Sequence, residues 1–206
     1  MSTFKKQKYL IVKKALSFDM ANFIYGYFSF KRRVAKKFFE ERYISPFTTE
    51  WGVWNDSQVL DTYCHYADIV METLLEKVRP RMEKETKLKL IPTYSYARIY
   101  KAGDVLKRHK DRPSCEISAT IFLGGNPWEL YIEPSGKEGE KGIKVMQKPG
   151  DMFIYSGCEL EHWREAFKGE HCCQVFLHYN REGSPRAKEN QFDRREFLGL
   201  PSYFKK

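Results

Sequence analysis

Hydrophobic and polar residues change their spacing near residue 88, and this change divides the chain into two parts. Before it, apolar side chains recur at intervals of three and four residues, which predicts amphipathic helices. After it, they fall in short runs separated by glycine and proline, which predicts β-strands joined by turns. A length of 206 residues suits one domain, so we expect both parts to share a single domain over residues 1–206.

The N-terminal part, residues 1–87, is expected to support the β-rich core. Residues 8–16 predict a strand, after which Ser17 or Asp19 can cap a helix that reaches Glu41. The apolar residues of this helix recur at helical spacing and are expected to pack against a sheet: Phe23, Ile24, Tyr27, Phe28, Val34 and Phe38. Its basic residues are typical of a solvated helix face, and a nucleic-acid-binding surface is the alternative.

Residues 43–57 break both periodicities and predict a loop, in which Trp51 and Trp54 cover the edge of the core or form the rim of a pocket. Residues 57–84 then predict a second helix, which Pro80 kinks or breaks because it lacks an amide proton. The expected buried stripe of this helix is Val59, Tyr63, Tyr66, Ile69, Val70, Leu74 and Val78. We expect His65, in the same segment, to be structural.

The β-rich part, residues 88–181, predicts an antiparallel jelly roll. Strands are expected near residues 93–100, 105–110, 116–123, 128–133, 143–147, 151–155, 159–164 and 171–179. His178 and Tyr179, at the end of the last strand, are expected to serve packing. Residues 182–206 read as a partly packed tail. The predicted fold class is therefore α+β with a mainly β core, a double-stranded β-helix (jelly roll, cupin-like) supported by N-terminal helices.

The strongest candidate chemistry lies in His109, Asp111 and His162. On a strand, residues i and i+2 share a face, so His109 and Asp111 can point together. Two imidazoles and one carboxylate form the facial triad that leaves coordination positions open on non-heme Fe(II). The simpler interpretation is that histidines beside acidic residues are common on protein surfaces. A structural zinc site is disfavoured, because such sites use four protein ligands and only three are apparent.

A longer pattern surrounds these ligands. It runs Arg98-Ile-Tyr100-x-x-Gly103-x-x-Leu106-x-x-His109-x-Asp111, followed by Pro149-Gly-Asp151, His162 and Gln174-Val-Phe-Leu-His-Tyr179. In this order the motifs resemble the signature of the prolyl 4-hydroxylase-like, 2-oxoglutarate- and Fe(II)-dependent dioxygenases, over roughly residues 75–181. The resemblance implies that Fe(II) is bound by the triad, that 2-oxoglutarate is the co-substrate and that dioxygen is consumed. Ascorbate is a further cofactor that it allows.

The resemblance also implies residues that bind 2-oxoglutarate. Tyr100 matches the family's co-substrate-binding tyrosine, and Thr120 lies on a strand from which its hydroxyl can reach the same carboxylate. The family's Lys or Arg, about nine or ten residues after the distal histidine, is replaced here by His171 and Cys172. This departure leaves the anchor of the distal carboxylate open.

Two residues compete for that role, His171 and Arg164. Arg164 shares a strand face with His162, and a protonated His171 imidazole can bind a carboxylate, though less securely than a guanidinium. Each has a structural alternative: His171 as a satisfied histidine of the barrel, and Arg164 as the partner of Glu161 or Glu165.

Charge and cysteine content change this interpretation little. The 36 basic and 27 acidic residues give a net charge of +9, which favours an acidic partner or serves surface solubility. The cysteines are odd in number and lack metal-ligand spacing, so we expect free thiols in a reducing, cytoplasmic compartment: Cys64, Cys115, Cys158, Cys172 and Cys173. The first residues lack an apolar signal core, and no stretch is long and apolar enough to span a membrane.

The resemblance implies an oxygenase, and its pattern favours hydroxylation of a prolyl residue in a peptide or protein. An oxygenase acting on nucleic acid is the main alternative, motivated by the net charge and the basic first helix, and a small-molecule substrate is another. A non-catalytic jelly-roll module that uses the same ligands for a metal is an alternative from a different class. The pattern predicts no oligomeric state.

Overall fold

The computed structural model describes residues 3–206. Met1 and Ser2, the start of the segment that lacks a signal core, lie outside the described residues. The chain opens with a short helix, α1 (Thr3–Gln7), and then adds strand β1 (Tyr9–Val12) to the edge of a sheet. The first predicted strand therefore exists but is shorter than residues 8–16.

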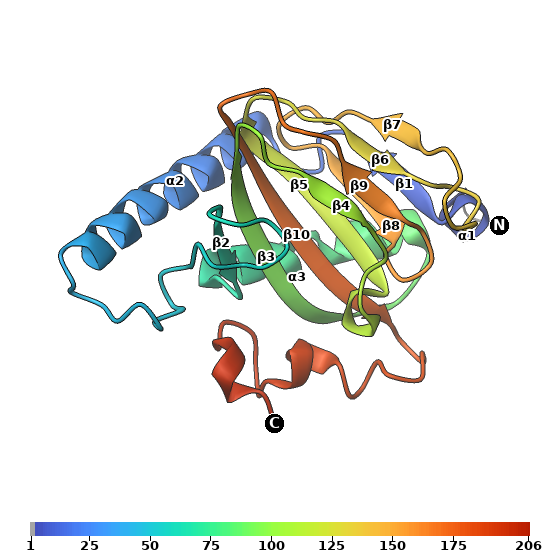
Figure 1. Ribbon diagram of the computed structural model, residues 1–206. Coiled ribbons are helices and arrows are strands. Elements are labelled where there is room, and N and C mark those ends of the chain that lie inside the picture. Colours follow the sequence, from blue (N-terminus) through green and yellow to red (C-terminus); the bar gives the residue numbers. More distant parts are fainter. Residues whose placement is uncertain (1–2) are drawn as a thin grey trace.

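Two antiparallel sheets form the core (Figure 1). The six-stranded sheet has the order β1, β8 (Met152–Ser156), β5 (Ile117–Gly125), β10 (His171–Arg181), β3 (Leu90–Lys101) and β2 (Tyr63–Tyr66). The four-stranded sheet has the order β4 (Leu106–His109), β9 (His162–Arg164), β6 (Leu130–Ile132) and β7 (Ile143–Val145). Each strand predicted after residue 88 is present, and the α+β jelly-roll class is confirmed.

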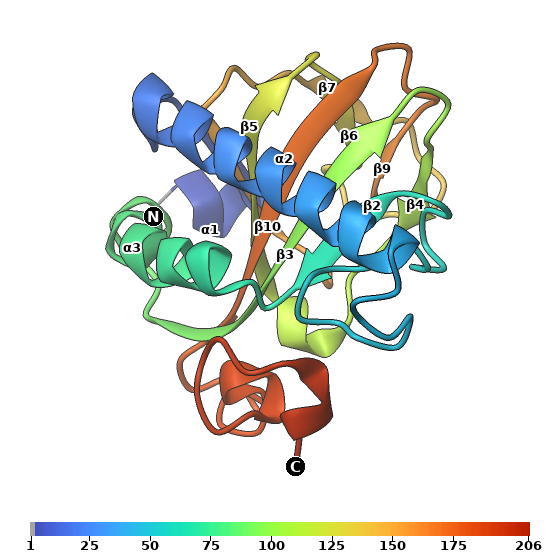
Figure 2. The ribbon, with the colours of Figure 1, turned by 90° about the vertical axis from the view of Figure 1, so that its left-hand side faces the viewer.

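Two long helices, α2 (Phe18–Glu40) and α3 (Ile69–Thr86), cross the outer face of the six-stranded sheet (Figure 2). The predicted cap of the first is confirmed, because the Ser17 hydroxyl accepts from the Met20 amide at 3.1 Å. The residues that α2 buries against the sheet are Ala21, Ile24, Phe28 and Ala35. The expectation for Phe23 and Val34 is wrong: each stands one residue, about 100° of helix rotation, from this stripe and is exposed.

The predicted helix over residues 57–84 is wrong at its start. Tyr63–Tyr66 is strand β2, which pairs with β3, because the exposed edge of β3 offers backbone partners that local spacing does not reveal. The helix begins only after Asp68, whose carboxylate accepts from the Val70 and Met71 amides at 3.0 and 3.2 Å. Ile69 is 70% exposed, not buried. The expected break at Pro80 is also wrong, since α3 continues through it to Thr86.

The remaining segments cover the edges of this core. Trp54 packs on Tyr63 with ring centroids 4.8 Å apart, so the interpretation of the tryptophans as core cover is confirmed. The C-terminal residues form the short helices η2 (Gln191–Arg194) and η3 (Ser202–Phe204), which lie at one end of the sheets in both views (Figures 1 and 2). A buried ion pair fastens this segment, with Arg195 Nη2 2.7 Å from Glu72 Oε1.

Two expectations on composition can be compared with the fold. All five cysteines lie within the described residues and are free thiols, as predicted. Among the helices of residues 3–206, none combines the length and apolar character needed to cross a bilayer. His65 donates through Nδ1 to the Asp68 carboxylate at 3.1 Å, which agrees with its structural role.

Candidate active site

The three predicted metal ligands meet between strands β4 and β9. His109 stands directly opposite His162 in the register of these strands. The Nδ1 atoms of His109 and His162 lie 2.7 and 3.1 Å from the carbonyl oxygens of Lys107 and Leu160, which accept their protons. The Nε2 atoms, on the other side of each ring, lie 3.7 and 3.5 Å from Asp111 Oδ1. Backbone acceptors that orient metal-binding imidazoles in this way are a usual feature of metal sites.

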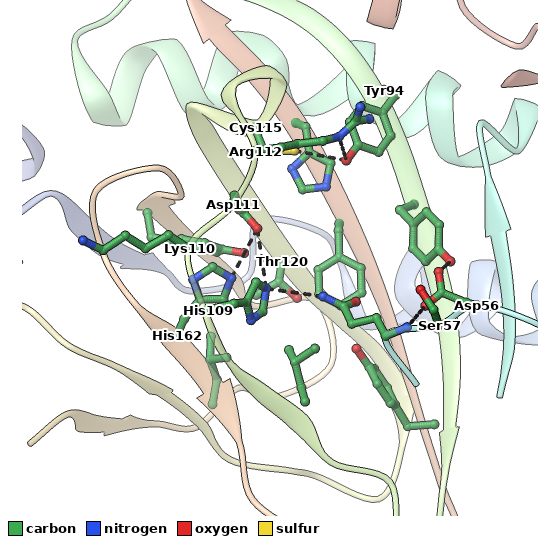
Figure 3. Close-up of a pocket in the computed structure, with 18 residues that line it drawn as sticks. Asp56, Ser57, Tyr94, His109, Lys110, Asp111, Arg112, Cys115, Thr120 and His162 are labelled. Carbon is green, nitrogen blue, oxygen red and sulfur yellow. Dashed lines mark hydrogen bonds and ion pairs between the residues drawn. The ribbon is translucent and has the colours of Figure 1, made fainter. Parts of the chain in front are cut away.

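Figure 3 shows the two imidazoles turned toward the Asp111 carboxylate, while the Lys110 side chain points away from it. One ligand atom from each of His109, Asp111 and His162 lies within 4.8 Å of the others. Burial lowers the pKa of His109, and the neighbouring His162 lowers it further, so His109 is neutral at pH 7. Neutral imidazoles and an ionised carboxylate are the forms that bind a divalent metal.

Asp111 follows β4 and is held by its surroundings on the six-stranded sheet. Its amide donates to the Gly157 carbonyl at 2.8 Å, and its Oδ2 accepts from the Ser118 hydroxyl at 2.9 Å. Burial acts to raise the pKa of Asp111, but the facing His162 imidazole and the Ser118 hydroxyl outweigh it and hold that pKa well below its usual range. The carboxyl is therefore ionised at neutral pH.

The triad opens onto a cavity of about 360 Å³ between the two sheets. Figure 3 shows the triad among the residues that line this cavity. Besides the triad, the residues that line it are Asp56, Ser57, Gln58, Tyr94, Tyr96, Tyr100, Leu106, Lys110, Arg112, Cys115, Thr120, Leu130, Tyr155, Phe176 and His178. This volume suits a small co-substrate together with one side chain of a larger substrate.

A second group of predicted residues lies at the closed end of the cavity. Tyr100 lines it, and its buried hydroxyl has no hydrogen-bond partner. Arg164 lies behind this wall, fully buried, and donates through Nη1 to the Trp128 carbonyl at 2.6 Å. Its Nε and Nη2 have no partner among the described residues. Burial raises the pKa of Tyr100, and the guanidinium groups of Arg98 and Arg164 oppose that shift.

Unpaired buried donors of this kind fit a carboxylate. A buried guanidinium normally has an anionic partner, because leaving it unpaired costs several kcal/mol, roughly, in the protein interior. The unpaired atoms of Arg164 and Tyr100 therefore match the distal carboxylate of 2-oxoglutarate, and the His109, Asp111 and His162 donor set matches Fe(II).

The structure treats the remaining predicted residues differently. Thr120 lines the cavity, but its hydroxyl donates to Gln174 Oε1 at 2.9 Å and is not free to donate to a carboxylate. His171 does not line the cavity. Its neighbour Cys172 packs with Tyr100 inside the barrel, so strand alternation turns His171 to the other face. The two alternative partners of Arg164 make other contacts: Glu161 pairs with Arg108 at 2.6 Å, and Glu165 Oε1 accepts from Trp163 Nε1 at 3.0 Å.

Three site residues were missed from the sequence. Arg98 shares a face of β3 with Tyr100 and pairs with Asp56 at 2.8 Å. The available signal was its position two residues before Tyr100, because such residues of a strand lie on one face. Gln58 Nε2 lies 3.4 Å from His109 Nε2, a contact that only the folded loop creates. The expectation that His178 serves packing alone is wrong: it lines the cavity and contacts Ser118 at 2.9 Å.

The fold is that of the 2-oxoglutarate- and Fe(II)-dependent oxygenases, so the resemblance is confirmed at the level of the fold. A prolyl 4-hydroxylase from Pseudomonas putida is similar over 87% of this chain and 96% of its own, with 14% identity and a TM-score of 0.61. A viral collagen prolyl hydroxylase from Paramecium bursaria Chlorella virus-1, in complex with 2-oxoglutarate, is similar over 86% and 98%, with 11% identity and a TM-score of 0.55.

Similarity extends to structures with other ligands. HygX from Streptomyces hygroscopicus, with nickel, 2-oxoglutarate and hygromycin B bound, covers 87% of this chain and 85% of its own, with 11% identity and a TM-score of 0.60. No protein-family model matches the sequence. No curated protein matches it either. These similarities define the class of fold, and they leave the substrate to chemical argument.

Proposed function

We propose that this protein is a 2-oxoglutarate- and Fe(II)-dependent dioxygenase. The observation that carries the proposal is the convergence of His109 Nε2, His162 Nε2 and Asp111 Oδ1 on one point, with both imidazoles oriented by backbone carbonyls. Three protein ligands on one side of a metal leave its other positions free for small molecules. The non-catalytic alternative, a closed structural metal site, would need a fourth ligand.

The chain's own residues bind and orient the reactants. His109, Asp111 and His162 would hold Fe(II), and Arg164 and Tyr100 would bind the distal carboxylate of 2-oxoglutarate. With both bound, the cofactor chemistry consumes dioxygen, converts 2-oxoglutarate to succinate and carbon dioxide, and hydroxylates a C–H bond. The apolar walls around Tyr100, including Leu106, exclude water from this end of the cavity.

We propose a prolyl residue in a peptide or protein as the substrate. Two of the similar structures are prolyl hydroxylases. The cavity lining also includes the aromatic rings of Tyr94, Tyr96 and Phe176, and aromatic-lined grooves are a common mode of recognition for proline-containing segments. The nucleic-acid alternative is less well supported, because Lys31 on the basic helix α2 is paired with the buried Asp68 at 2.5 Å.

The iron site is tested by anaerobic Fe(II) titration. We expect one Fe(II) per wild-type chain and loss of binding in His109→Ala, Asp111→Ala and His162→Ala. His171→Ala is the matched control, since this histidine lies outside the cavity and should bind iron normally. Triad variants with wild-type affinity and stoichiometry would refute the site.

The substrate is tested separately, by mass spectrometry of products formed with Fe(II), 2-oxoglutarate and dioxygen. We expect addition of one oxygen to proline-containing peptides, with succinate formed in equal amount, and little dependence of binding on salt. Oxidation of oligonucleotides with proline peptides unchanged, and with affinity that falls steeply as salt rises, would instead favour the nucleic-acid reading. Oxidation of free small molecules alone would favour the alternative of a small-molecule substrate.

A further inference from the structure

The two oxygens of the Asp111 carboxylate have different surroundings. Oδ1 faces the Nε2 atoms of His109 and His162, where a metal would bind. Oδ2 turns away from them and accepts from the hydroxyl of Ser118, which is fully buried on β5. Within residues 3–206, the hydrogen bond to Oδ2 comes from Ser118, on the side of the carboxylate away from the two imidazoles.

The hydroxyl of Ser118 has three neighbours but only one proton. They are Asp111 Oδ2 at 2.9 Å, the Cys115 carbonyl at 3.1 Å and His178 Nδ1 at 2.9 Å. A carboxylate and a carbonyl can only accept, so one of them takes the Ser118 proton, and the charged carboxylate is the stronger acceptor. His178 Nδ1 must then be the donor, with its proton directed at Ser118 Oγ.

We infer that Ser118 and His178 are positioning residues for the metal site, linked as His178 Nδ1–H to Ser118 Oγ–H to Asp111 Oδ2. Together with the Asp111 backbone, which Gly157 holds, this relay would keep Oδ1 of the carboxylate toward the two histidines. It rests on the proposed function only in that Asp111 is taken to be a metal ligand. Hydrogen-bonded neighbours of ligating carboxylates act in this way at metal sites generally.

The fold supports both members of the relay. Ser118 and His178 are cross-strand partners on β5 and β10, so the sheet fixes their separation. The His178 ring also packs on Tyr94 with centroids 4.6 Å apart, which limits its rotation. Because Ser118 gives its only proton to Asp111, the contact between Ser118 Oγ and His178 requires the proton of His178 to lie on Nδ1.

Anaerobic titration with Fe(II), and with Co(II) as a spectroscopic probe, tests the relay. Ser118→Ala should weaken metal binding about 10- to 100-fold, the usual effect of losing such a neighbour. His178→Leu and His178→Asn form a matched pair of similar shape, of which only Asn retains an N–H near the position of Nδ1. We expect His178→Leu to lose affinity as Ser118→Ala does and His178→Asn to stay within about threefold of wild type.

A purely structural role for His178 would produce a different pattern. The two His178 variants would then differ only in how they pack on Tyr94. Their thermal stability would change, while their metal affinity would equal that of the wild type. Equal metal affinities in wild type, Ser118→Ala and His178→Leu would overturn the inference. Wild-type protein that binds no Fe(II) would instead refute the proposed function.

A second measurement avoids variants that fail to fold. In ¹⁵N NMR spectra of the Zn(II)-loaded wild-type protein, the His178 ring should appear as the Nδ1–H tautomer at pH 7. The Nε2–H tautomer, which prevails in free histidine, would contradict the proton count and the relay.

Discussion

Replacing Arg164 with methionine should separate co-substrate binding from folding. The Arg164 side chain is fully buried over the Trp128 ring, and within residues 3–206 only its Nη1 has a hydrogen-bond partner. Its Nε and Nη2 have none, although a buried charge without a partner is destabilising. Methionine has a similar length and no charge, so it removes the proposed carboxylate anchor without leaving a large cavity.

The structure sets the size of both effects. Two charge-assisted hydrogen bonds to a carboxylate contribute about 1.5–3 kcal/mol each. Loss of the pair should therefore weaken 2-oxoglutarate binding by at least about 3 kcal/mol, or roughly 100-fold or more in Kd. Without 2-oxoglutarate, the same change should leave the free energy of unfolding unchanged or raise it by about 1–4 kcal/mol, as in other replacements of buried charges by apolar groups.

The assay is titration of 2-oxoglutarate into the Co(II)-loaded protein, combined with thermal unfolding in the presence and absence of 2-oxoglutarate. Arg164→Met should retain Co(II) and lose the stabilisation by 2-oxoglutarate. His171→Leu serves as the control and should bind 2-oxoglutarate normally. Wild-type affinity in Arg164→Met, together with weak binding in His171→Leu, would refute the choice of anchor.

Two further predictions concern the metal site and the scaffold. A Cβ at Gly157 would lie 2.3 Å from Asp111 Oδ2 and 2.5 Å from the Cys115 carbonyl, so Gly157→Ala should weaken Fe(II) binding at least about tenfold. Gly26→Ala, where a Cβ meets nothing within 4 Å, is the control in the same titration. Burial acts to raise the pKa of Asp68, but the hydrogen bonds and charges of His65 and Lys31 hold that pKa well below its usual range. The ionised Asp68 therefore stabilises the folded state at pH values above the ordinary Asp pKa of about 3.9, and this stabilisation is lost as the pH falls below that value. In urea unfolding, Asp68→Asn should lower the free energy of unfolding by about 3 kcal/mol at pH 7 and by progressively less below about pH 4. A difference between wild type and variant that stays constant with pH would contradict this prediction.

Local sequence determined the ligand chemistry. His109 and Asp111 are two residues apart, and a strand or its direct extension places such residues on one side whatever the rest of the chain does. The fold class followed from similar reasoning, because turn residues and short apolar runs after residue 88 are properties of neighbouring residues. The one-domain organisation stays a prediction.

Errors arose where distant segments decide local structure. Tyr63 and Tyr66 fit a helical stripe by spacing, yet the edge of β3 draws them into strand β2 through backbone hydrogen bonds. Phe23 and Val34 are as hydrophobic as their buried neighbours, but the sheet covers only one face of α2. Hydrophobic periodicity shows that a face exists, and it does not show which residues the partner surface will reach.

The anchor and the relay depended on tertiary structure alone. Arg164 and His171 were equal candidates from the sequence. What separates them is that Arg164 lies over Trp128, which packs with Tyr100, whereas His171 alternates with the inward-facing Cys172. Ser118 and His178 stand 60 residues apart, and only the pairing of β5 with β10 joins them beside Asp111. Contacts between strands distant in the chain are set by sheet order and register, which depend on the packing of the whole core rather than on any local run of residues.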